Sequence, residues 1–379
     1  MLYIDKLFFD SDGWKLSNRE IRDNQDCSIV FLFGESEAIK ESRIYDDLKQ
    51  RYPKAFIVGA SSAGNIFDAE ISKYPIVASA VQFEKSFVKT STVDFTDDTD
   101  IDKLTSKLLS QLPQDNLQHI FILFDGLNIN GSQVIRGLNN ARGTFSVSGG
   151  IAGDGDRFME SLVVSDEPAC RNRIVAVGFY GDSLIISTGC QSGWDSFGPD
   201  RVVTKSVENT LFELDGQPAL KLYKEYLGDF ADELPMSGMR FPLNIRPDDN
   251  ENREVTRTLL AIDEEKQSIT FAGDIPEGYI ARLMKANLDS LIDGASAAAD
   301  TICKVAEKRG LGLVVSCVGR RVAMKELVEE ELDAIADVLG KDVHLSGFYS
   351  YGEIAPIQTD DNHCQLHNQT MTLTVVYEK

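Results

Sequence analysis

The sequence predicts an α/β protein with α+β character, in which two domains each contain a mixed β-sheet covered by helices. Three observations support this prediction. Continuous apolar runs, typical of strands covered on both faces, alternate with amphipathic helical patterns in the first half of the chain. A meander of short strands follows them. At 379 residues the chain is long for one hydrophobic core, so we expect two domains.

The first domain is predicted to begin with the buried strand Cys27–Gly34 and the helix Glu35–Arg51, which ends before Pro53. The short strand Ala55–Gly59 then leads into a loop of small residues at Ala60–Asn65. The further helices predicted in this half are Ile101–Leu112 and one that ends near Arg142. The further strands are Ile76–Phe95 (one or two strands), Ile120–Phe124, Leu162–Ser165, Arg173–Tyr180, Leu184–Thr188 and Val202–Val207.

The domain boundary is placed before Leu214–Leu227, where an Asp-Gly turn and an early proline introduce a helix. The predicted organisation is an N-terminal extension (1–26), a first domain (27–213) and a second domain (214–379). No internal repeat is evident. The further helices predicted for the second domain are Leu288–Lys308 and Ala323–Leu339. Its strands are a hairpin of Thr256–Ile262 and Ser268–Ala272, followed by Tyr279–Met284, Leu311–Cys317, Val343–Tyr349 and Met371–Tyr377.

Charge and composition narrow the range of partners. The formal net charge is −22 and the pI is about 4.6, so the chain repels phosphate backbones and anionic membrane surfaces. We therefore expect neither a nucleic-acid partner nor a membrane partner. The N-terminal residues do not resemble a signal peptide, and no run approaches the roughly 20 apolar residues of a membrane span. The six scattered cysteines then suggest reduced thiols in the cytoplasm.

Polar residues gather at two predicted strand ends near the C-terminus. Tyr349, Tyr351 and Glu353 lie at or just beyond the end of one strand, and His367 and Asn368 precede the other. A polar rim above an apolar sheet is the usual construction of a small-molecule pocket. The same residue types also make structural corners, so both interpretations remain open.

Two small-residue loops are further candidates. Ser61 and Ser62 offer hydroxyl and amide groups, and Gly149, Gly150 and Asp154 belong to a glycine-rich loop. Neither nucleotide-binding fingerprint fits that loop, and its carboxylates oppose a phosphate. It suits a ligand amine or guanidinium better, and a tight turn between strands is the alternative.

Motifs for catalysis are lacking. The sequence contains no G-x-S-x-G, no H-E-x-x-H and no kinase signature. Cys317 and His367 could form a nucleophilic pair, as in a Cys-dependent hydrolase, but no third group is spaced to orient them. His363, Cys364 and His367 could offer metal ligands, and a non-covalent haem held by one imidazole is open. We expect a protein that is not an enzyme.

A set of motifs resembles the FIST family, whose members carry a FIST N and a FIST C domain. The resemblance covers nearly the whole chain. Its motifs are GASSAGNI (59–66), FDGL (124–127), GGIAGDGDRF (149–158), VTKSVENTLFELDGQPALKLYKEYLG (203–228), TRTLLAID (256–263), GDIPEG (273–278), SCVGRR (316–321), GFYSYGEIAP (347–356) and LHNQTMTLT (366–374). One departure is Asn65, at a position where the family commonly has an acidic residue.

The resemblance implies an intracellular sensor of small ligands, with amino acids suggested, that signals to a histidine kinase or another signalling protein. The segment GWDSFGPDR (193–201) is similar to the NosP-type branch of the family, whose members bind haem b and sense nitric oxide, and His367 is then the implied iron ligand. Arg257 and Arg320 lie within family motifs and could pair with a haem propionate or a ligand carboxylate. Either arginine could equally form an internal salt bridge. A non-haem sensor of amino acids or related metabolites is the alternative.

Overall fold

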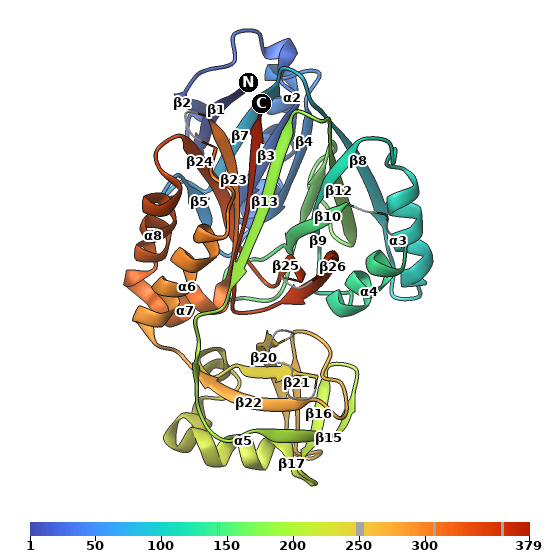
Figure 1. The fold of residues 1–379 in the computed structure, drawn as a ribbon, viewed down its shortest axis with the longest axis vertical. Coiled ribbons are helices and arrows are strands. Elements are labelled where there is room, and N and C mark those ends of the chain that lie inside the picture. The colour runs from blue at the N-terminus through green and yellow to red at the C-terminus, as the bar shows by residue number, and fades with distance from the viewer. Residues whose placement is uncertain (142, 144, 248–253, 306–307, 358–359) are drawn as a thin grey trace.

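The computed structural model describes all residues except 142, 144, 248–253, 306–307 and 358–359. A large lobe contains three six-stranded mixed sheets, and a small lobe contains a nine-stranded sheet (Figure 1). The predicted mixed α/β class with two domains is confirmed. The boundary predicted at residues 213 and 214 lies within a strand of the small lobe, and it stays a prediction.

The strands of the large lobe form three sheets of similar design. The first sheet has the order β11 (Val163–Ser165), β4 (Phe56–Ser61), β3 (Ile29–Gly34), β7 (Ile76–Phe83), β1 (Leu2–Asp10) and β2 (Gly13–Asn18). The second has β26 (Asp360–His367), β25 (Glu353–Ile357), β10 (Ser146–Ile151), β9 (Leu117–Phe124), β12 (Arg173–Tyr180) and β8 (Phe87–Asp94). The third has β13 (Leu184–Gln191), β27 (Met371–Glu378), β23 (Gly310–Cys317), β24 (Val343–Ser350), β5 (Asn65–Phe67) and β6 (Glu70–Ile71).

One strand pattern is repeated three times. In each sheet two neighbouring parallel strands (β3 and β4, β9 and β10, β23 and β24) are connected through a helix, which is α2 (Ser42–Arg51), α4 (Gly131–Ala141) or α8 (Glu329–Leu339). The first strand of the pair also bonds antiparallel to β7, β12 or β27, and that strand bonds antiparallel to β1, β8 or β13. The large lobe therefore contains an internal threefold repeat that the sequence did not reveal.

The three repeats exchange strands in a cycle. The segment after β4 supplies β5 to the third sheet, the segment after β24 supplies β25 to the second, and the segment after β10 supplies β11 to the first. Residues 1–26, predicted as an extension, contain β1 and β2 of the first sheet. No single repeat can therefore complete its own sheet.

The parallel strands approach very closely at one equivalent position in each repeat. A methyl group at Gly59 would lie 1.9 Å from the Leu32 carbonyl oxygen, and the corresponding distances are 1.9 Å from Ile122 at Gly149 and 1.8 Å from Val314 at Gly347. Only glycine fits there, because any Cβ would overlap the neighbouring backbone.

Helices and small elements cover the outside of the sheets. In Figure 1, α3 and α4 lie on one side of the large lobe, and α6, α7 and α8 lie on the other. The phenyl rings of the three inner faces meet in the middle, with ring centroids 5.9 Å apart for Phe31 and Phe121 and 4.8 Å apart for Phe33 and Phe348. The remaining elements of this lobe are the 3-10 turns Asn24–Asp26 and Lys325–Leu327, α1 (Ser36–Ile39), α3 (Ile101–Ser110), α6 (Leu288–Asp300) and α7 (Val318–Met324).

The small lobe is an insertion between β13 and α6. Figure 1 shows it below the large lobe, with α5 on its outer side. No helix in the described part of the chain is both long and apolar enough to cross a membrane. The elements of the small lobe are β14 (Asp195–Ser196), β15 (Arg201–Val207), β16 (Thr210–Leu214), β17 (Gln217–Pro218), α5 (Ala219–Leu227), the 3-10 helices η2 (Gly228–Glu233) and η3 (Met236–Arg240), β18 (Leu243–Arg246), β19 (Val255–Arg257), β20 (Leu259–Asp263), β21 (Ser268–Phe271) and β22 (Ile280–Lys285).

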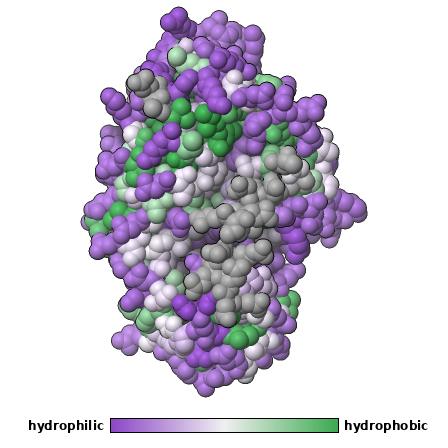
Figure 2. All heavy atoms as spheres, viewed as in Figure 1, coloured by the Kyte–Doolittle hydropathy of each residue, from purple (hydrophilic) through white to green (hydrophobic). Residues whose placement is uncertain are grey.

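Several predicted elements differ from the structure at their ends. Two helices, α1 and α2, replace the single helix predicted over 35–51, and α6 ends at Asp300 rather than at residue 308. The strand predicted over Val343–Tyr349 ends one residue later, at Ser350, and Pro356 lies within the next strand, β25, paired opposite Cys364. The face drawn in Figure 2 is mostly polar, in agreement with the high charge of the chain.

The glycine positions give a first prediction. Gly347→Ala should destabilise the fold by about 3 kcal/mol, because the added methyl group overlaps a backbone carbonyl that cannot move without disturbing the sheet. Urea unfolding followed by circular dichroism measures the change. Gly143→Ala is the control, since the atoms around that position lie 3.4 Å or more from a new Cβ. Equal unfolding midpoints for the two variants would contradict the close approach.

Candidate functional site

A polar cavity of about 310 Å³ lies where loops of all three repeats meet. Its size is in the range of small-molecule sites. Residues that follow β3, β4 and β10 form most of its wall, and Arg321 of α7, after β23, completes it. The lining residues are Glu35, Ser36, Glu37, Ser62, Ala63, Gly64, Asn65, Ile71, Ser72, Asp154, Gly155, Asp156, Arg157 and Arg321.

Backbone hydrogen bonds fix these loops in a ring. The Gly153 amide donates to the Ser61 carbonyl at 2.8 Å, the Ala63 amide to the Tyr349 carbonyl at 2.8 Å, and the Tyr351 amide to the Ile151 carbonyl at 3.1 Å. Each bond connects the loop of one repeat to the strand end of another. The cavity wall is thus supported by main-chain contacts between all three repeats.

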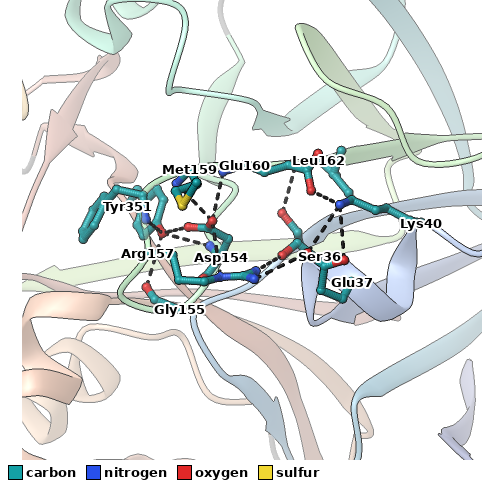
Figure 3. A network of polar contacts seen from close by, with 12 residues as sticks. Ser36, Glu37, Lys40, Asp154, Gly155, Arg157, Met159, Glu160, Leu162 and Tyr351 are labelled. Carbon is teal, nitrogen blue, oxygen red and sulfur yellow. Dashed lines mark hydrogen bonds and ion pairs between the residues drawn. The ribbon is translucent and has the colours of Figure 1, made fainter.

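Arg157 connects two of the loops that line the cavity (Figure 3). Its Nε donates to the Asp154 carbonyl at 3.0 Å, its Nη1 lies 3.4 Å from Glu37 Oε1, and its Nη2 donates to the Ser36 hydroxyl. The Arg157 side chain is 44% exposed, so solvent screening weakens its ion pairs. This guanidinium can therefore exchange partners at low cost.

Arg321 has a different environment. Its Nη1 donates to the Ala63 carbonyl, and its guanidinium carbon lies 5.8 Å from the centre of the Tyr349 ring. Within the described residues, no carboxylate lies within 4 Å of Arg321. Glu35 and Asp156 are exposed at the same cavity, and neither has a described cation within 4 Å. The cavity therefore contains uncompensated charges of both signs.

Asp154 braces the loop beside the cavity. One carboxylate oxygen accepts from the Tyr351 hydroxyl, and the other accepts from the Met159 and Glu160 amides at 3.1 and 2.9 Å (Figure 3). The Tyr351 ring stacks on Phe158 at 4.3 Å between centroids. Burial, together with the nearby Asp154 carboxylate, raises the pKa of Tyr351, so the phenol stays protonated. In the structure both residues brace this loop.

The two predicted serines have separate positions. Ser62 lines the cavity, and its hydroxyl donates to Asn65 Oδ1 at 2.5 Å. Ser61 is fully buried, and its hydroxyl accepts from the Leu162 amide at 2.8 Å. Asn65 Nδ2 donates to the carbonyls of Tyr74 and Pro75, both at 3.1 Å. A carboxylate at position 65 has no hydrogen to donate, which explains why an amide suits this chain.

The predicted glycines lie away from the cavity. Gly149 and Gly150 belong to β10, and a Cβ on Gly150 would lie 2.5 Å from Val315 Cγ1. These residues permit close packing between sheets. They do not contact the space available to a ligand.

Arg320 and Tyr349 belong to a buried network around Glu331. Arg320 is fully buried, and its Nη2 lies 2.8 Å from Glu331 Oε2. Glu331 Oε1 accepts from the Tyr349 hydroxyl at 2.8 Å and the Ser316 hydroxyl at 3.0 Å. Removing one member of such a pair leaves a buried charge without compensation. The structure gives Arg320 an internal ion pair, which was one of its two predicted roles.

Cys317 and Glu353 are neighbours in the interior. Burial raises the pKa of the Cys317 thiol, so it is not the thiolate that a nucleophile requires. Glu353 accepts from the Ser350 hydroxyl at 2.6 Å and from the Thr370 hydroxyl at 3.0 Å, and burial raises its pKa to about 8. The Asn368 amide nearby is fully buried, with neither polar atom hydrogen-bonded within the described chain.

His367 lies on β26 opposite Glu353, and Arg257 lies on β19 of the small lobe. Burial and the Arg257 charge lower the pKa of His367 to about 4, so its imidazole is neutral, and its buried Nε2 has no described hydrogen-bond partner. The imidazole could therefore ligate haem iron. A porphyrin also needs a wide apolar slot, and His367 lines neither polar cavity found in the structure. Neither described polar cavity places such a slot beside the imidazole.

Of the residues predicted from the sequence, Ser62 and Asp154 line the 310 Å³ cavity. Residues not predicted include Arg157, Arg321, Glu35 and Glu37. Arg157 and Arg321 were visible as the arginines of GDGDRF and SCVGRR. Within the described residues no three His, Cys, Asp or Glu side chains lie close enough together to bind a metal. His363, Cys364 and His367, which were predicted as metal ligands, do not form such a cluster.

Glu353 gives a prediction about pH. Its raised pKa means that the folded protein retains a proton that an unfolded carboxyl, with a pKa near 4.3, has released. Its stabilising effect is complete below about pH 4 and is lost as the pH rises through 8. Glu353→Gln should therefore reduce the loss of unfolding free energy between pH 5 and pH 9, measured by urea unfolding. The exposed Glu326→Gln should keep the wild-type profile, and a wild-type profile in both variants would disprove the assignment.

Solved structures give little further guidance. A cyanuric acid hydrolase from A. caulinodans aligns with 100% of this chain and 99% of its own, with a TM-score of 0.37 and 8% identity. A second structure of a cyanuric acid hydrolase aligns over the full length of both chains, with a TM-score of 0.37 and 9% identity. Similarity at this level supports no inference about function.

Sequence comparisons identify the family. The uncharacterized protein MJ1623 of Methanocaldococcus jannaschii is 23% identical over 422 aligned residues, covering 100% of this chain and 79% of the relative. The family model for the FIST N domain matches residues 28–217, and that for the FIST C domain matches residues 219–356. The chain therefore belongs to the FIST family, whose domains are generally sensory signal-transduction domains.

Proposed function

We propose that this protein senses an amino acid or a related zwitterionic metabolite, and that the ligand binds in the 310 Å³ cavity at the meeting point of the three repeats. The observation that carries the proposal is the set of charged side chains there without a described ion pair, which are Arg321, Glu35 and Asp156. Binding without chemical conversion is the activity proposed, since the cavity lining contains no cysteine or histidine.

An α-amino acid has the charges that complement this cavity. Its carboxylate can pair with Arg321 in the two-pronged geometry that guanidinium groups favour. Its ammonium group can pair with Glu35 or Asp156. The Ser36 and Ser62 hydroxyls and the backbone of Gly64 and Gly155 are available for further polar contacts.

Binding can be transmitted because the cavity is shared between repeats. Arg157 contacts Glu37 and Ser36 of the first repeat, while its own loop is braced by Tyr351 of the third. A ligand that binds more tightly to one arrangement of these loops shifts the population toward it. We propose that a partner protein, such as a histidine kinase, reads this shift.

A haem-based nitric oxide sensor of the NosP type is the second candidate. The observation that favours it is the neutral His367 imidazole with its unpartnered Nε2. The absence of His367 from both polar cavities favours the metabolite sensor instead.

The first test uses Arg321→Gln and isothermal titration calorimetry with the amino acid that most raises the melting temperature of the wild type. Loss of a charge-assisted contact should weaken binding about 10- to 100-fold. Arg43→Gln is the matched control, since Arg43 is exposed, pairs with Glu41 and lies outside the cavity. Undiminished affinity in Arg321→Gln would rule out this pairing.

The second test assigns the ammonium contact. Glu35→Gln should weaken binding of the amino acid about tenfold and leave the affinity for its deaminated analogue unchanged, since the analogue lacks the ammonium group. Glu35 has no described ion pair, so the substitution should not disturb folding. An equal loss for both ligands would show that Glu35 does not contact the ammonium group.

The two candidates are separated by an absorption titration with hemin. For the metabolite sensor we expect the spectrum of free hemin in the wild type and in His367→Ala. A saturable Soret band that is lost in His367→Ala and responds to nitric oxide would establish the haem sensor.

A further inference from the structure

A second cavity, of about 460 Å³, lies between the two lobes. We propose that it is a separate binding site for a small organic carboxylate, which the Arg257 guanidinium recognises. The large lobe contributes residues of α4 and β26, including Arg136, and the small lobe contributes residues around β19, including Arg257, Asp274 and Tyr279. A ligand in this site would contact both lobes.

The state of Arg257 is the main evidence. The residue is only 7% exposed. Its Nε donates to the Asp274 carbonyl at 3.1 Å, and its Nη1 donates to the carbonyls of Leu366 and Thr256 at 2.9 and 3.3 Å. All three acceptors are neutral, and within the described residues no carboxylate oxygen lies within 4 Å of this guanidinium. The Asp274 carboxylate attracts this guanidinium from beyond ion-pair distance, so no described residue neutralises it directly. A buried charge without a direct ion pair is costly, and a carboxylate ligand would supply one.

The other residues of the cavity favour the same ligand class. Arg136 brings a second guanidinium from α4, and it has no ion pair within the described chain. Asp274 is the one carboxylate in the described lining, and its Oδ1 already accepts from the Asn130 amide at 2.9 Å. Burial lowers the pKa of Arg257 only to about 10, so its charge persists at neutral pH. Two guanidiniums against one carboxylate make this a positive cavity in a chain of net charge −22.

The two cavities therefore select different ligands. The first is lined by four carboxylates and two guanidiniums, which repels a simple anion and accepts a group with a positive charge. The inter-lobe cavity has the opposite balance. Since no described residue lines both, the inter-lobe site can be tested independently of the proposed amino-acid site.

Existing contacts between the lobes surround the cavity. The Asn130 side-chain amide of the large lobe donates to the Asp274 carboxylate at 2.9 Å, and the Asp274 backbone amide donates to the Ser132 hydroxyl at 3.0 Å. The Gln133 side-chain amide donates to the Glu208 carboxylate at 3.1 Å. A carboxylate between Arg136 and Arg257 would add a contact across the same junction.

The test measures thermal unfolding of the full chain with succinate, citrate, 2-oxoglutarate or pyruvate at 10 mM, against sodium chloride at matched ionic strength. At least one carboxylate should raise the melting temperature, because a ligand that binds only the folded state stabilises it. Arg257→Gln should weaken that carboxylate at least tenfold, and Arg321→Gln, in the first cavity, should leave its affinity unchanged. No shift with any of the four, or an undiminished affinity in Arg257→Gln, would overturn the proposal.

Two further measurements cover the case in which Arg257→Gln does not fold. Arg136 is exposed, so Arg136→Gln should fold normally and bind the same carboxylate more weakly. Hydrogen–deuterium exchange of the wild type should slow at 132–140 and 255–257 when the carboxylate is added, and should stay unchanged at 62–65. Slower exchange at 62–65 alone would place the carboxylate in the first cavity and contradict the inter-lobe site.

Discussion

The close approach of parallel strands at Gly59, Gly149 and Gly347 is the constraint on which the rest of the structure depends. Each glycine lets two neighbouring parallel strands of one repeat approach closely, and the loops beyond the three strand ends hydrogen-bond to one another in a ring. Because each repeat also gives a strand to another sheet, the ring cannot form from one repeat alone. The loops that line the first cavity are therefore fixed by main-chain geometry before any side chain contributes.

The first cavity arises where the threefold repeat is broken. In two repeats the exchanged strand follows almost at once, with β5 beginning at Asn65 after β4 ends at Ser61, and β25 beginning at Glu353 after β24 ends at Ser350. In the remaining repeat β11 begins only at Val163, although β10 ends at Ile151. The longer loop carries Asp154 and Arg157, and it needs Tyr351 and Phe158 to hold its shape. An irregular loop on a regular frame is a common way to place a binding site.

The sequence predicted what local patterns can encode. Apolar runs marked the buried strands around Phe31, Phe121 and Val314, and the motifs identified the family. The repeat was not visible in the sequence because its shared features are the strand register and three glycines. The repeats also differ in content, since the first has the strand β2 where the others have a helix, and the third contains the small lobe.

The roles of individual side chains depended on contacts that only the fold creates. Asp154 was a plausible ligand group until its oxygens were found bonded to Tyr351 and to the Met159 and Glu160 amides, and no local signal distinguished Arg321 from its buried neighbour Arg320.

The two cavities are connected through the elements that join the lobes. Arg321, at the first cavity, lies on α7. Gly319, on the same helix, packs against the Gln369 side chain. Gln369 donates to the Met239 carbonyl of the small lobe at 3.0 Å, and three residues earlier in the chain the Leu366 carbonyl accepts from Arg257. The helix that carries Arg321 and the side chain of Arg257 thus both contact the β26–β27 connection. If the two proposed sites differ in affinity between two arrangements of this connection, each ligand must change the affinity for the other by the same factor. The short segment from Leu366 to Gln369 lies between these contacts, and it holds buried polar atoms of His367 and Asn368 that have no hydrogen-bond partner within the described chain. Because such atoms are costly to leave unpaired, a rearrangement of this segment that gave them partners would be favoured.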